Sequence, residues 1–276
     1  MSSSILISVC MITYAHEKYI EEAILSVLNQ ETKHDVEIII ADDSSPDSTK
    51  IIVEDLIQNH ENGHWIKYHR HDNNKGMIDN FVWALQQCKG KYIALCEGDD
   101  YWTDPLKLQK QIDFMEQNKK YSICFHTVRI KLEKEDEIVD DFLTRNVNET
   151  SNIYELAKQN FIHTPSVLFR NELEGYPEQF LEAPIGDYIL YMFLLRNGNL
   201  IKKIEKAMAV YRVHDKGMWS NKDKTPSIIQ YLDILVKYFE NKDKKVMKIL
   251  KERKEKITRG QKLHFKVIRK FRNLLK

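Results

Sequence analysis

The first hundred residues alternate between short apolar segments and segments whose apolar residues recur at helical spacing. This alternation is typical of a mostly parallel sheet with helices on both faces, because two parallel strands must be joined by a crossover connection, usually a helix. The expected strands cover residues 5–12, 36–41, 65–69 and 92–96, and the expected helices cover residues 20–28, 46–59 and 77–88.

Acidic residues follow two of these strands directly. They are Asp42 and Asp43 after one strand, and Glu97, Asp99 and Asp100 after the other. If both strands run parallel, both groups stand at the sheet edge where open α/β folds bind ligands. Carboxylate oxygens packed this closely suit Mg²⁺ or Mn²⁺, which often also binds substrate phosphates. The alternatives are a solvated acidic turn and, for Asp43, a cap on the following helix.

Two common phosphate-binding motifs do not occur. No G-x-G-x-x-G follows the first strand, and the sequence has no G-x-x-x-x-G-K-[ST]. Neither a dinucleotide-binding fold nor a P-loop is therefore supported. If the chain binds phosphate, its charge must be neutralised in another way, which again indicates a metal ion.

The pattern is less regular after Trp102. From about residue 226 onward the chain is expected to be helical. Ser45 is expected to cap a helix whose first residue is Pro46, and His69 and His71 are expected to lie in a solvated turn. Other expected elements are helices over 105–118, 153–160 and 185–197, strands over 121–130, 166–169, 200–204 and 207–211, and a loop or hairpin over 131–150.

Composition favours a globular protein of the cytoplasm. Hydrophobic residues make up 42% and charged residues 30% of the 276 residues, as in ordinary globular domains. No apolar run approaches the roughly 18 residues of a membrane span, and the N-terminus lacks the basic region and cleavage site of a signal peptide. The four cysteines are scattered through apolar segments, which favours packing roles in a reducing compartment.

The C-terminal segment has a charge of its own. Residues 241–276 contain fifteen basic and three acidic side chains, a net charge of +12, so the rest of the chain carries −11 of the overall +1. Residues 262–276 place apolar side chains near one helical face and basic ones elsewhere, which suits peripheral contact with an anionic membrane. The alternative is packing on the body or on a second subunit. Nucleic-acid binding is not expected, because no aromatic platform or recognition motif accompanies the charge.

Three segments give the chain a family resemblance. They are ISVCMITYAHEKYIEEAILSVLNQ, EIIIADDSSPDST and GKYIALCEGDDYWTDPLKLQKQ, in this order. Together they resemble the family 2 glycosyltransferases over about residues 5–215, especially bacterial members that build surface glycans. The resemblance implies the GT-A fold, an α/β fold with a Rossmann-like, mostly parallel sheet. We therefore expect a glycosyltransferase domain over 1–220, with nucleotide and acceptor halves over 1–104 and 105–220, and a basic helical extension over 221–276.

The resemblance also implies roles for particular residues. The sequence departs from the family pattern at Ala15, where Asn is common, and at Glu97, where Asp is usual. The implied roles are nucleotide-sugar binding for Thr13, Tyr14, Asp42, Asp43, Lys75, Asn80, Glu97 and Asp99; metal binding for Asp99, Asp100 and His214; general base for Asp187; and acceptor binding for Trp102, His163 and Thr164.

The implied activity is metal-dependent, inverting transfer of a sugar from a nucleotide donor, with UDP expected, to a lipid-linked oligosaccharide or polysaccharide. The metal, Mn²⁺ or Mg²⁺, would neutralise the leaving diphosphate, and Asp187 would take the proton of the acceptor hydroxyl. The expected location is the cytoplasm, with peripheral contact at the inner face of the membrane. Two alternatives remain: a non-catalytic nucleotide-sugar or glycan-binding module, and a nucleotidyltransferase, although TYAHEK is not the glycine-rich basic loop that the latter would need.

Overall fold

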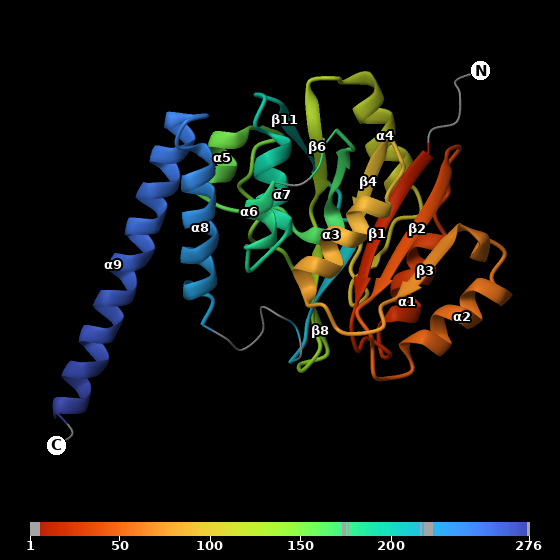
Figure 1. Ribbon diagram of the computed structural model, residues 1–276, viewed down its shortest axis with the longest axis horizontal. Coiled ribbons are helices and arrows are strands. Elements are labelled where there is room, and N and C mark those ends of the chain that lie inside the picture. Colours follow the sequence, from red (N-terminus) through yellow and green to blue (C-terminus); the bar gives the residue numbers. More distant parts are fainter. Residues whose placement is uncertain (1–5, 173–174, 176, 216, 218–222, 275–276) are drawn as a thin grey trace.

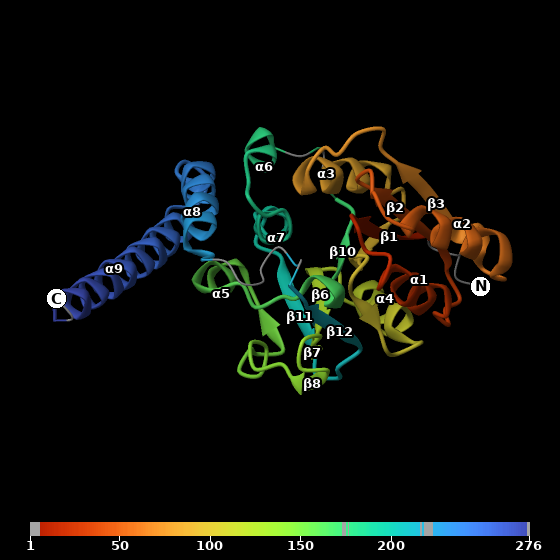
Figure 2. The ribbon, with the colours of Figure 1, turned by 90° about the horizontal axis from the view of Figure 1, so that it is seen from below.

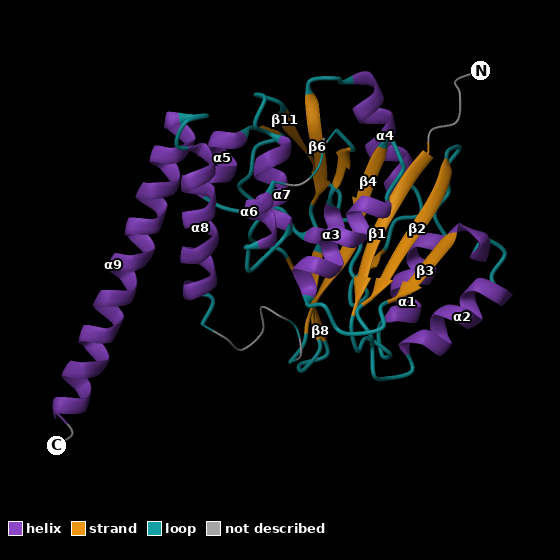
Figure 3. Cartoon of the chain, in the orientation of Figure 1, coloured by secondary structure: helices purple, strands orange, loops and turns teal. Residues whose placement is uncertain are grey.

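The computed structural model describes residues 6–172, 175, 177–215, 217 and 223–274, and an eight-stranded sheet forms the centre of this part of the chain (Figures 1 and 3). Its strands are β1 (Leu6–Thr13), β2 (Asp35–Asp42), β3 (Ile66–Arg70), β4 (Tyr92–Leu95), β6 (Tyr121–His126), β9 (Thr150–Ser151), β10 (Leu168–Arg170) and β11 (Leu200–Ile204). They are ordered β3-β2-β1-β4-β10-β6-β11-β9. The first four strands are parallel, whereas β10 is antiparallel to both its neighbours. The mixed, mostly parallel α/β fold expected from the sequence is confirmed.

Helices cover both faces of this sheet. One face carries α1 (Ile20–Leu28), α2 (Thr49–Asn59) and α4 (Lys107–Gln117), and the other carries α3 (Met77–Gln87), α5 (Ile153–Lys158) and α7 (Asp187–Leu194). Helix α8 (Thr225–Phe239) packs against α7 in the same core. A one-turn helix, α6 (Glu178–Leu181), precedes α7. Successive strand residues point to opposite faces, so Val9 and Met11 pack with α1 while Cys10 packs with α3. Two apolar cores result, and they explain why the strands read as nearly continuous apolar runs.

A second, four-stranded sheet packs beside the end of β4. Its strands are β5 (Tyr101–Trp102), β12 (Ala209–Val213), β7 (Arg129–Leu132) and β8 (Glu137–Asp140), in that order. Pairing of β5 with β12 is antiparallel, and it places Ala209 opposite Trp102. This pairing brings Arg212 and His214 next to the acids that follow β4, although they are more than a hundred residues away in the sequence.

Several expected boundaries were wrong. Helix α2 begins at Thr49 rather than at Pro46, and Ser45 is not its cap, since its hydroxyl instead accepts a hydrogen bond from the backbone N–H of Ala15. The strand expected over 121–130 is interrupted after His126, where the chain leaves the large sheet for the small one. Helix α7 ends at Leu194, although a helix to residue 197 was expected. The nucleotide half over 1–104 and the acceptor half over 105–220 stay a prediction, and strand β4 of the first pairs with strand β10 of the second.

The C-terminal helices form an arm on one side of the molecule. Helix α9 (Lys244–Leu274) lies beside α8 and extends away from the body, as Figures 1 and 2 show. Its first turns are anchored by Val246 and Leu250, which are fully buried in the core that contains α7 and α8. Side chains are described only as far as residue 260, so the amphipathic face expected over 262–276 lies outside them. Among the helices described, none combines the length and apolar character that a bilayer span requires.

Candidate functional site

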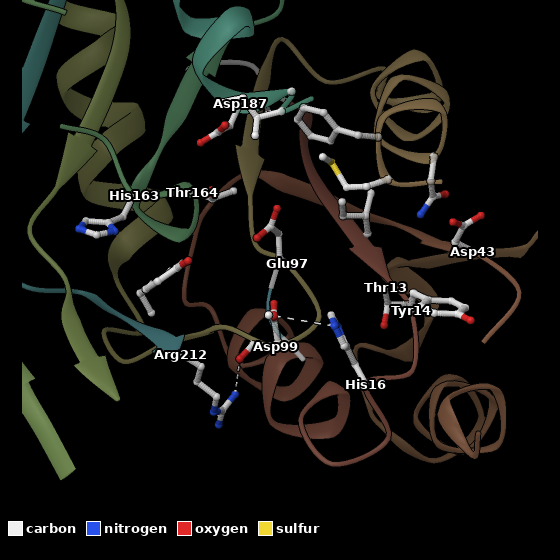
Figure 4. Close-up of a pocket in the computed structure, with 18 of the residues that line it drawn as sticks. Thr13, Tyr14, His16, Asp43, Glu97, Asp99, His163, Thr164, Asp187 and Arg212 are labelled. Carbon is white, nitrogen blue, oxygen red and sulfur yellow. Dashed lines mark hydrogen bonds and ion pairs between the residues drawn. The ribbon is translucent and has the colours of Figure 1, made fainter. Parts of the chain in front are cut away.

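A pocket of about 580 Å³ opens at the carboxyl ends of β1, β2 and β4 (Figure 4). The N-terminal turns of α3 and α7, the segment 160–164 and the end of β12 complete its walls. The predicted edge of the parallel sheet is therefore the edge that carries the pocket. Of the residues singled out from the sequence, those that line it are Thr13, Tyr14, Asp43, Asn80, Glu97, Asp99, His163, Thr164 and Asp187.

Asp43 and Tyr14 form one end of the pocket. The carboxylate of Asp43 accepts hydrogen bonds from the backbone N–H groups of Lys75, at 2.7 Å, and Gly76, at 2.9 Å. Gly76 has a φ of 88°, a left-handed conformation that glycine adopts without strain. Tyr14 is 47% exposed, so its ring is available to an incoming molecule. This end combines a flat aromatic surface with a loop fixed by Asp43.

The two loops that follow β1 and β2 have strained backbones. Ala15 has a φ of 56° and Ser44 a φ of 65°, values that cost a residue with a side chain about 1–2 kcal/mol. The backbone N–H of Ala15 donates to the Ser45 hydroxyl at 3.0 Å, so the loops support each other. Strain of this kind is common where a loop must present its backbone to a ligand.

Three acids from the loop after β4 stand in the middle of the pocket region. One carboxylate oxygen from each of Glu97, Asp99 and Asp100 lies within 4.8 Å of the others. Gly98 is required between them, because a Cβ there would sit 2.8 Å from the Thr13 hydroxyl oxygen. Burial raises the pKa of Glu97 well above its usual range, and the nearby charges of Asp99 and Asp187 raise it further. Such crowding of negative charge favours a cation between the carboxylates.

Asp100 is more buried than its neighbours. Its Oδ1 accepts a hydrogen bond from the backbone N–H of Arg212 at 2.8 Å. Its Oδ2 is buried and lacks a hydrogen-bond partner within the described part of the chain. A buried carboxylate oxygen without a partner is costly, and a bound metal ion would satisfy it.

His16 is a site residue that the sequence did not identify. One nitrogen of His16, one carboxylate oxygen of Asp99 and one nitrogen of His214 all lie within 4.8 Å. Burial would raise the pKa of Asp99, but the hydrogen bond from His214 and the proximity of His16 outweigh it and hold that pKa below its usual value. The sequence shows a histidine in the polar turn after the first strand, but it does not show that this turn lies beside Asp99 in the folded chain.

Among the described residues that line the pocket, Arg212 is the one arginine, and it lies beside acidic side chains. Its guanidinium donates to the backbone oxygen of Asp99 at 2.7 Å and forms ion pairs with Glu133, at 3.1 Å, and Glu22. The pocket also contains the carboxylates of Asp43, Glu97, Asp99 and Asp187. The described lining therefore has an excess of negative charge.

Asp187 is the first residue of α7 and faces Glu97 across the pocket (Figure 4). Burial raises the pKa of its carboxyl group, although hydrogen bonds from the backbone N–H of Tyr188 and from Thr164 act in the opposite direction. His163 lies nearby and pairs with Asp141 at 3.2 Å. A carboxylate held at a helix N-terminus with a raised pKa is suited to accept a proton.

Three other predicted residues do not line the pocket. Asp42 is fully buried and accepts hydrogen bonds from Tyr68 and from the backbone of Ser45, so it supports the loop from behind. Lys75 donates a hydrogen bond to Asp43 from its backbone N–H group. Trp102 is 4% exposed and its indole N–H donates to the carbonyl of Pro165, a packing role rather than contact with the pocket.

Asn80 is held on both sides. Its side chain donates to the carbonyl of Ala41 at 2.9 Å, and its oxygen lies 3.0 Å from Nε2 of His71. His71 is 2% exposed, so the expectation that it is solvated was wrong, whereas His69 is exposed as expected and stacks on Trp83. The two contacts of Asn80, with Ala41 and His71, hold the first turn of α3 against β2.

Comparison with known families agrees with this geometry. The model of the family described as "Glycosyl transferase family 2" matches residues 8–174. An uncharacterized protein of Mycobacterium tuberculosis is 35% identical over 215 residues, which cover 77% of this chain and 60% of that protein. The chain thus spans less than two thirds of that relative's length. The Escherichia coli protein WfaP, named as a UDP-Glc:alpha-D-GlcNAc-diphosphoundecaprenol beta-1,3-glucosyltransferase, is 28% identical, with 79% of this chain and 82% of WfaP covered.

Solved structures share the fold. S. aureus TarS in complex with UDP-GlcNAc superposes with a TM-score of 0.61 at 18% identity, covering 85% of this chain and 73% of the other. A mannosyltransferase of Pyrobaculum calidifontis, in complex with GDP-Man and Mn²⁺, gives a TM-score of 0.64 at 14% identity, covering 92% and 70%. These superpositions show that the chain shares the GT-A fold, and at identities this low they show nothing about its substrates.

Proposed function

Because the chain belongs to glycosyl transferase family 2, we propose that it transfers a sugar from a UDP-sugar to a lipid-linked oligosaccharide or polysaccharide in the synthesis of a cell-surface glycan. One observation carries the proposal. A single pocket joins an aromatic and acidic end at Tyr14 and Asp43, a cluster of carboxylates at Glu97 and Asp99, and a candidate base at Asp187.

The charge of the pocket supports dependence on a divalent metal. A nucleotide diphosphate is negative, and so is the described lining, where four carboxylates outnumber one arginine that is already paired. The donor would therefore be repelled unless a cation accompanied it. Asp99 would hold this cation with Asp100 or with His16 and His214, and carboxylate and imidazole donors fit Mn²⁺ well and Mg²⁺ less well. Once bound, the ion would neutralise charge that develops on the leaving diphosphate.

The nucleotide would lie with its base at Tyr14. The exposed ring offers a stacking surface, and Asp43 is kept in place by the backbone of residues 75 and 76. Thr13 has a buried hydroxyl without a hydrogen-bond partner among the described residues. A ligand or a water molecule at this end would satisfy it. The relative WfaP is named for a UDP-sugar, which favours UDP over other nucleotides.

Asp187 would act as the general base. It lies across the pocket from Glu97 and Asp99 (Figure 4), so a sugar positioned between them would have the acceptor on one side and the diphosphate on the other. Asp187 would take the proton from the acceptor hydroxyl as that oxygen attacks the anomeric carbon. A single displacement of this kind inverts the anomeric configuration. His163 and Thr164, which line the same wall, would contact the acceptor.

The basic extension would bring the site to a lipid-linked acceptor. Its net charge of +12 over residues 241–276 would attract an anionic membrane surface at the inner face of the cell membrane. Flotation of the full chain with vesicles containing anionic lipid tests this, with a chain ending at residue 260 as the comparison. Equal flotation of both chains would count against a membrane role for residues 261–276.

Donor binding and transfer separate the proposed function from its rivals. In a thermal-shift assay, UDP-sugars should raise the melting temperature in the presence of Mn²⁺ and not in its absence, because a ligand that binds only the folded state stabilises it. Asp99→Asn should abolish that effect, whereas Asp187→Asn should retain it and lose transfer. Donor binding without transfer or hydrolysis by the wild type would indicate a binding module instead. Release of diphosphate and formation of a sugar nucleotide would indicate a nucleotidyltransferase.

A further inference from the structure

Arg253 of α9 joins three helices at one point. Its guanidinium donates to the hydroxyl of Tyr188 in α7 and to the hydroxyl of Tyr231 in α8, both at 2.8 Å. The two tyrosine rings pack edge to face with centroids 5.1 Å apart, and both are buried. The Tyr188 hydroxyl in turn donates to the carbonyl of Leu156 at the end of α5, at 3.0 Å. The C-terminal helix is therefore fixed to α7 by charge-assisted hydrogen bonds.

Tyr188 is the residue that follows Asp187. Both residues stand in the first turn of α7, and the side chain of Tyr188 is held by Arg253. Because Asp187 and Tyr188 are adjacent in the chain, a change in the position of the Tyr188 ring would move the N-terminal turn of α7. That turn carries the carboxylate that faces the pocket.

Docking of α9 does not itself depend on Arg253. Val246 and Leu250 are fully buried in the core, and Met247, Ile249 and Ile257 pack against it in part. Arg253 is half-buried and lies between Leu250 and Ile257 on the helix. Removing its guanidinium would leave the apolar contacts of α9 in place, which makes the polar contacts separable from folding.

We propose that Arg253 is a positioning residue for transfer: through Tyr188 it holds the N-terminal turn of α7 so that Asp187 meets the acceptor hydroxyl. The inference rests on the proposed role of Asp187 as general base. It makes the C-terminal arm part of the active site rather than an appendage. The donor end of the pocket, at Tyr14 and Asp43, lies on other elements and is not held by this contact.

The test compares Arg253→Met with Lys254→Met in the full chain. Lys254 is the neighbouring residue on α9 and forms an ion pair with Asp233 on α8. Within the described part of the chain, neither of these side chains forms a hydrogen bond or ion pair with α7. Arg253→Met should lower kcat about 10- to 100-fold, as expected when a reacting group is displaced by about an ångström. The KM for the donor and the metal-dependent thermal shift should stay at wild-type values. Lys254→Met should match the wild type in all three.

Two further measurements make the route through Tyr188 testable. Tyr188→Phe should reduce kcat similarly, and the double variant Arg253→Met/Tyr188→Phe should be no slower than the worse single variant, because both substitutions remove the same contact between Arg253 and Tyr188. Amide hydrogen exchange of residues 186–190 should be faster in Arg253→Met than in Lys254→Met. Arg253→Lys, which retains a donor, should recover part of kcat.

The outcomes separate this inference from the proposed function. If the wild type transfers sugar and Arg253→Met has the kcat and the exchange rates of Lys254→Met, the positioning role is wrong and the transferase proposal stands. Additive losses in the double variant would also contradict the route through Tyr188. If the wild type binds donor but transfers nothing, the proposed function itself fails, and faster exchange in Arg253→Met would then report a structural contact alone.

Discussion

Nε2 of His214 lies 3.0 Å from Oδ2 of Asp99. The same carboxylate oxygen is 3.8 Å from Nε2 of His16. One histidine follows β12 and the other follows β1, so a single acid joins two segments that are about 200 residues apart in the sequence. Two imidazole nitrogens directed at one carboxylate oxygen form a set of donors that suits Mn²⁺ better than Mg²⁺.

Replacing His16 tests this set of donors. His16→Ala should weaken Mn²⁺ binding in the presence of UDP about tenfold or more, a loss typical even of residues that only support a ligand. Mg²⁺ binding should change less, because Mg²⁺ prefers oxygen ligands. Isothermal titration with each ion measures both effects. Unchanged Mn²⁺ affinity would instead assign the ion to Glu97, Asp99 and Asp100.

Asp187→Asn should reduce kcat by about 10²–10⁴-fold, the usual contribution of a general base. The KM for the donor should be little changed, since Asp187 is not at the base end of the pocket. Steady-state kinetics with a defined lipid-linked acceptor measure both parameters. A variant that loses donor binding together with kcat would contradict the assignment of Asp187 to the acceptor side.

The same substitution should stabilise the protein at neutral pH. Burial raises the pKa of Asp187 in the folded state, so folding favours its protonated form. The stability it contributes is therefore present below the unfolded pKa and is lost as the pH rises through the raised folded pKa. Asp187→Asn avoids this loss. Its melting temperature should exceed that of the wild type at pH 7, and the difference should shrink as the pH falls toward 4, close to the unfolded carboxyl pKa of about 3.9.

Transfer by the wild type should also depend on pH through Asp187. A base must be unprotonated, and a raised pKa means that protonation begins at a higher pH than for an exposed aspartate. The kcat should therefore fall on the acidic side at a pH above the range usual for carboxyl groups. A profile of kcat against pH, measured with saturating donor, gives the apparent pKa of the complex. An acidic limb at the ordinary aspartate value would show that Asp187 is not the group that titrates.

Asp43→Ala should weaken donor binding and lower stability. The carboxylate accepts two backbone hydrogen bonds from the loop at residues 75 and 76, and the loss of such contacts at a buried site costs about 1–3 kcal/mol. Asp42→Asn is a matched control, because Asp42 is buried behind the pocket and contacts Tyr68. It should lower the melting temperature while leaving the donor KM near the wild-type value. Equal effects of both variants on the donor KM would contradict a direct role of Asp43 in donor binding.

The sequence predicted the parts of the site that follow directly from strands. The acids after β2 and β4 follow apolar runs, and parallel strands bring their carboxyl ends to one edge, so their proximity was predictable. Asp187 could be placed at the start of a helix, and the family resemblance supplied its expected role. The prediction placed the parallel part of the sheet well because long apolar runs carry a strong signal.

Contacts made by tertiary packing were not predictable in the same way. His16 reaches Asp99 only because β12 and the loop after β1 meet beside β4, a long-range arrangement that leaves no trace in local spacing. Trp102 illustrates the opposite error, since a tryptophan next to an acid-rich motif suggests a ligand contact, whereas the pairing of β5 with β12 buries it. Ser45 has the composition of a helix cap, but its hydroxyl is used by the neighbouring loop.

Arg253 follows Tyr188 in the sequence by more than sixty residues, and this order has a consequence for biosynthesis. A nascent chain can form β1 to β4, with the carboxylates that follow them, while the C-terminal helix is still inside the ribosome. The contact between Arg253 and Tyr188 can form only after α9 has emerged. If Arg253 positions Asp187 as proposed, newly made protein would form the strands of the donor site before it reaches full transfer activity.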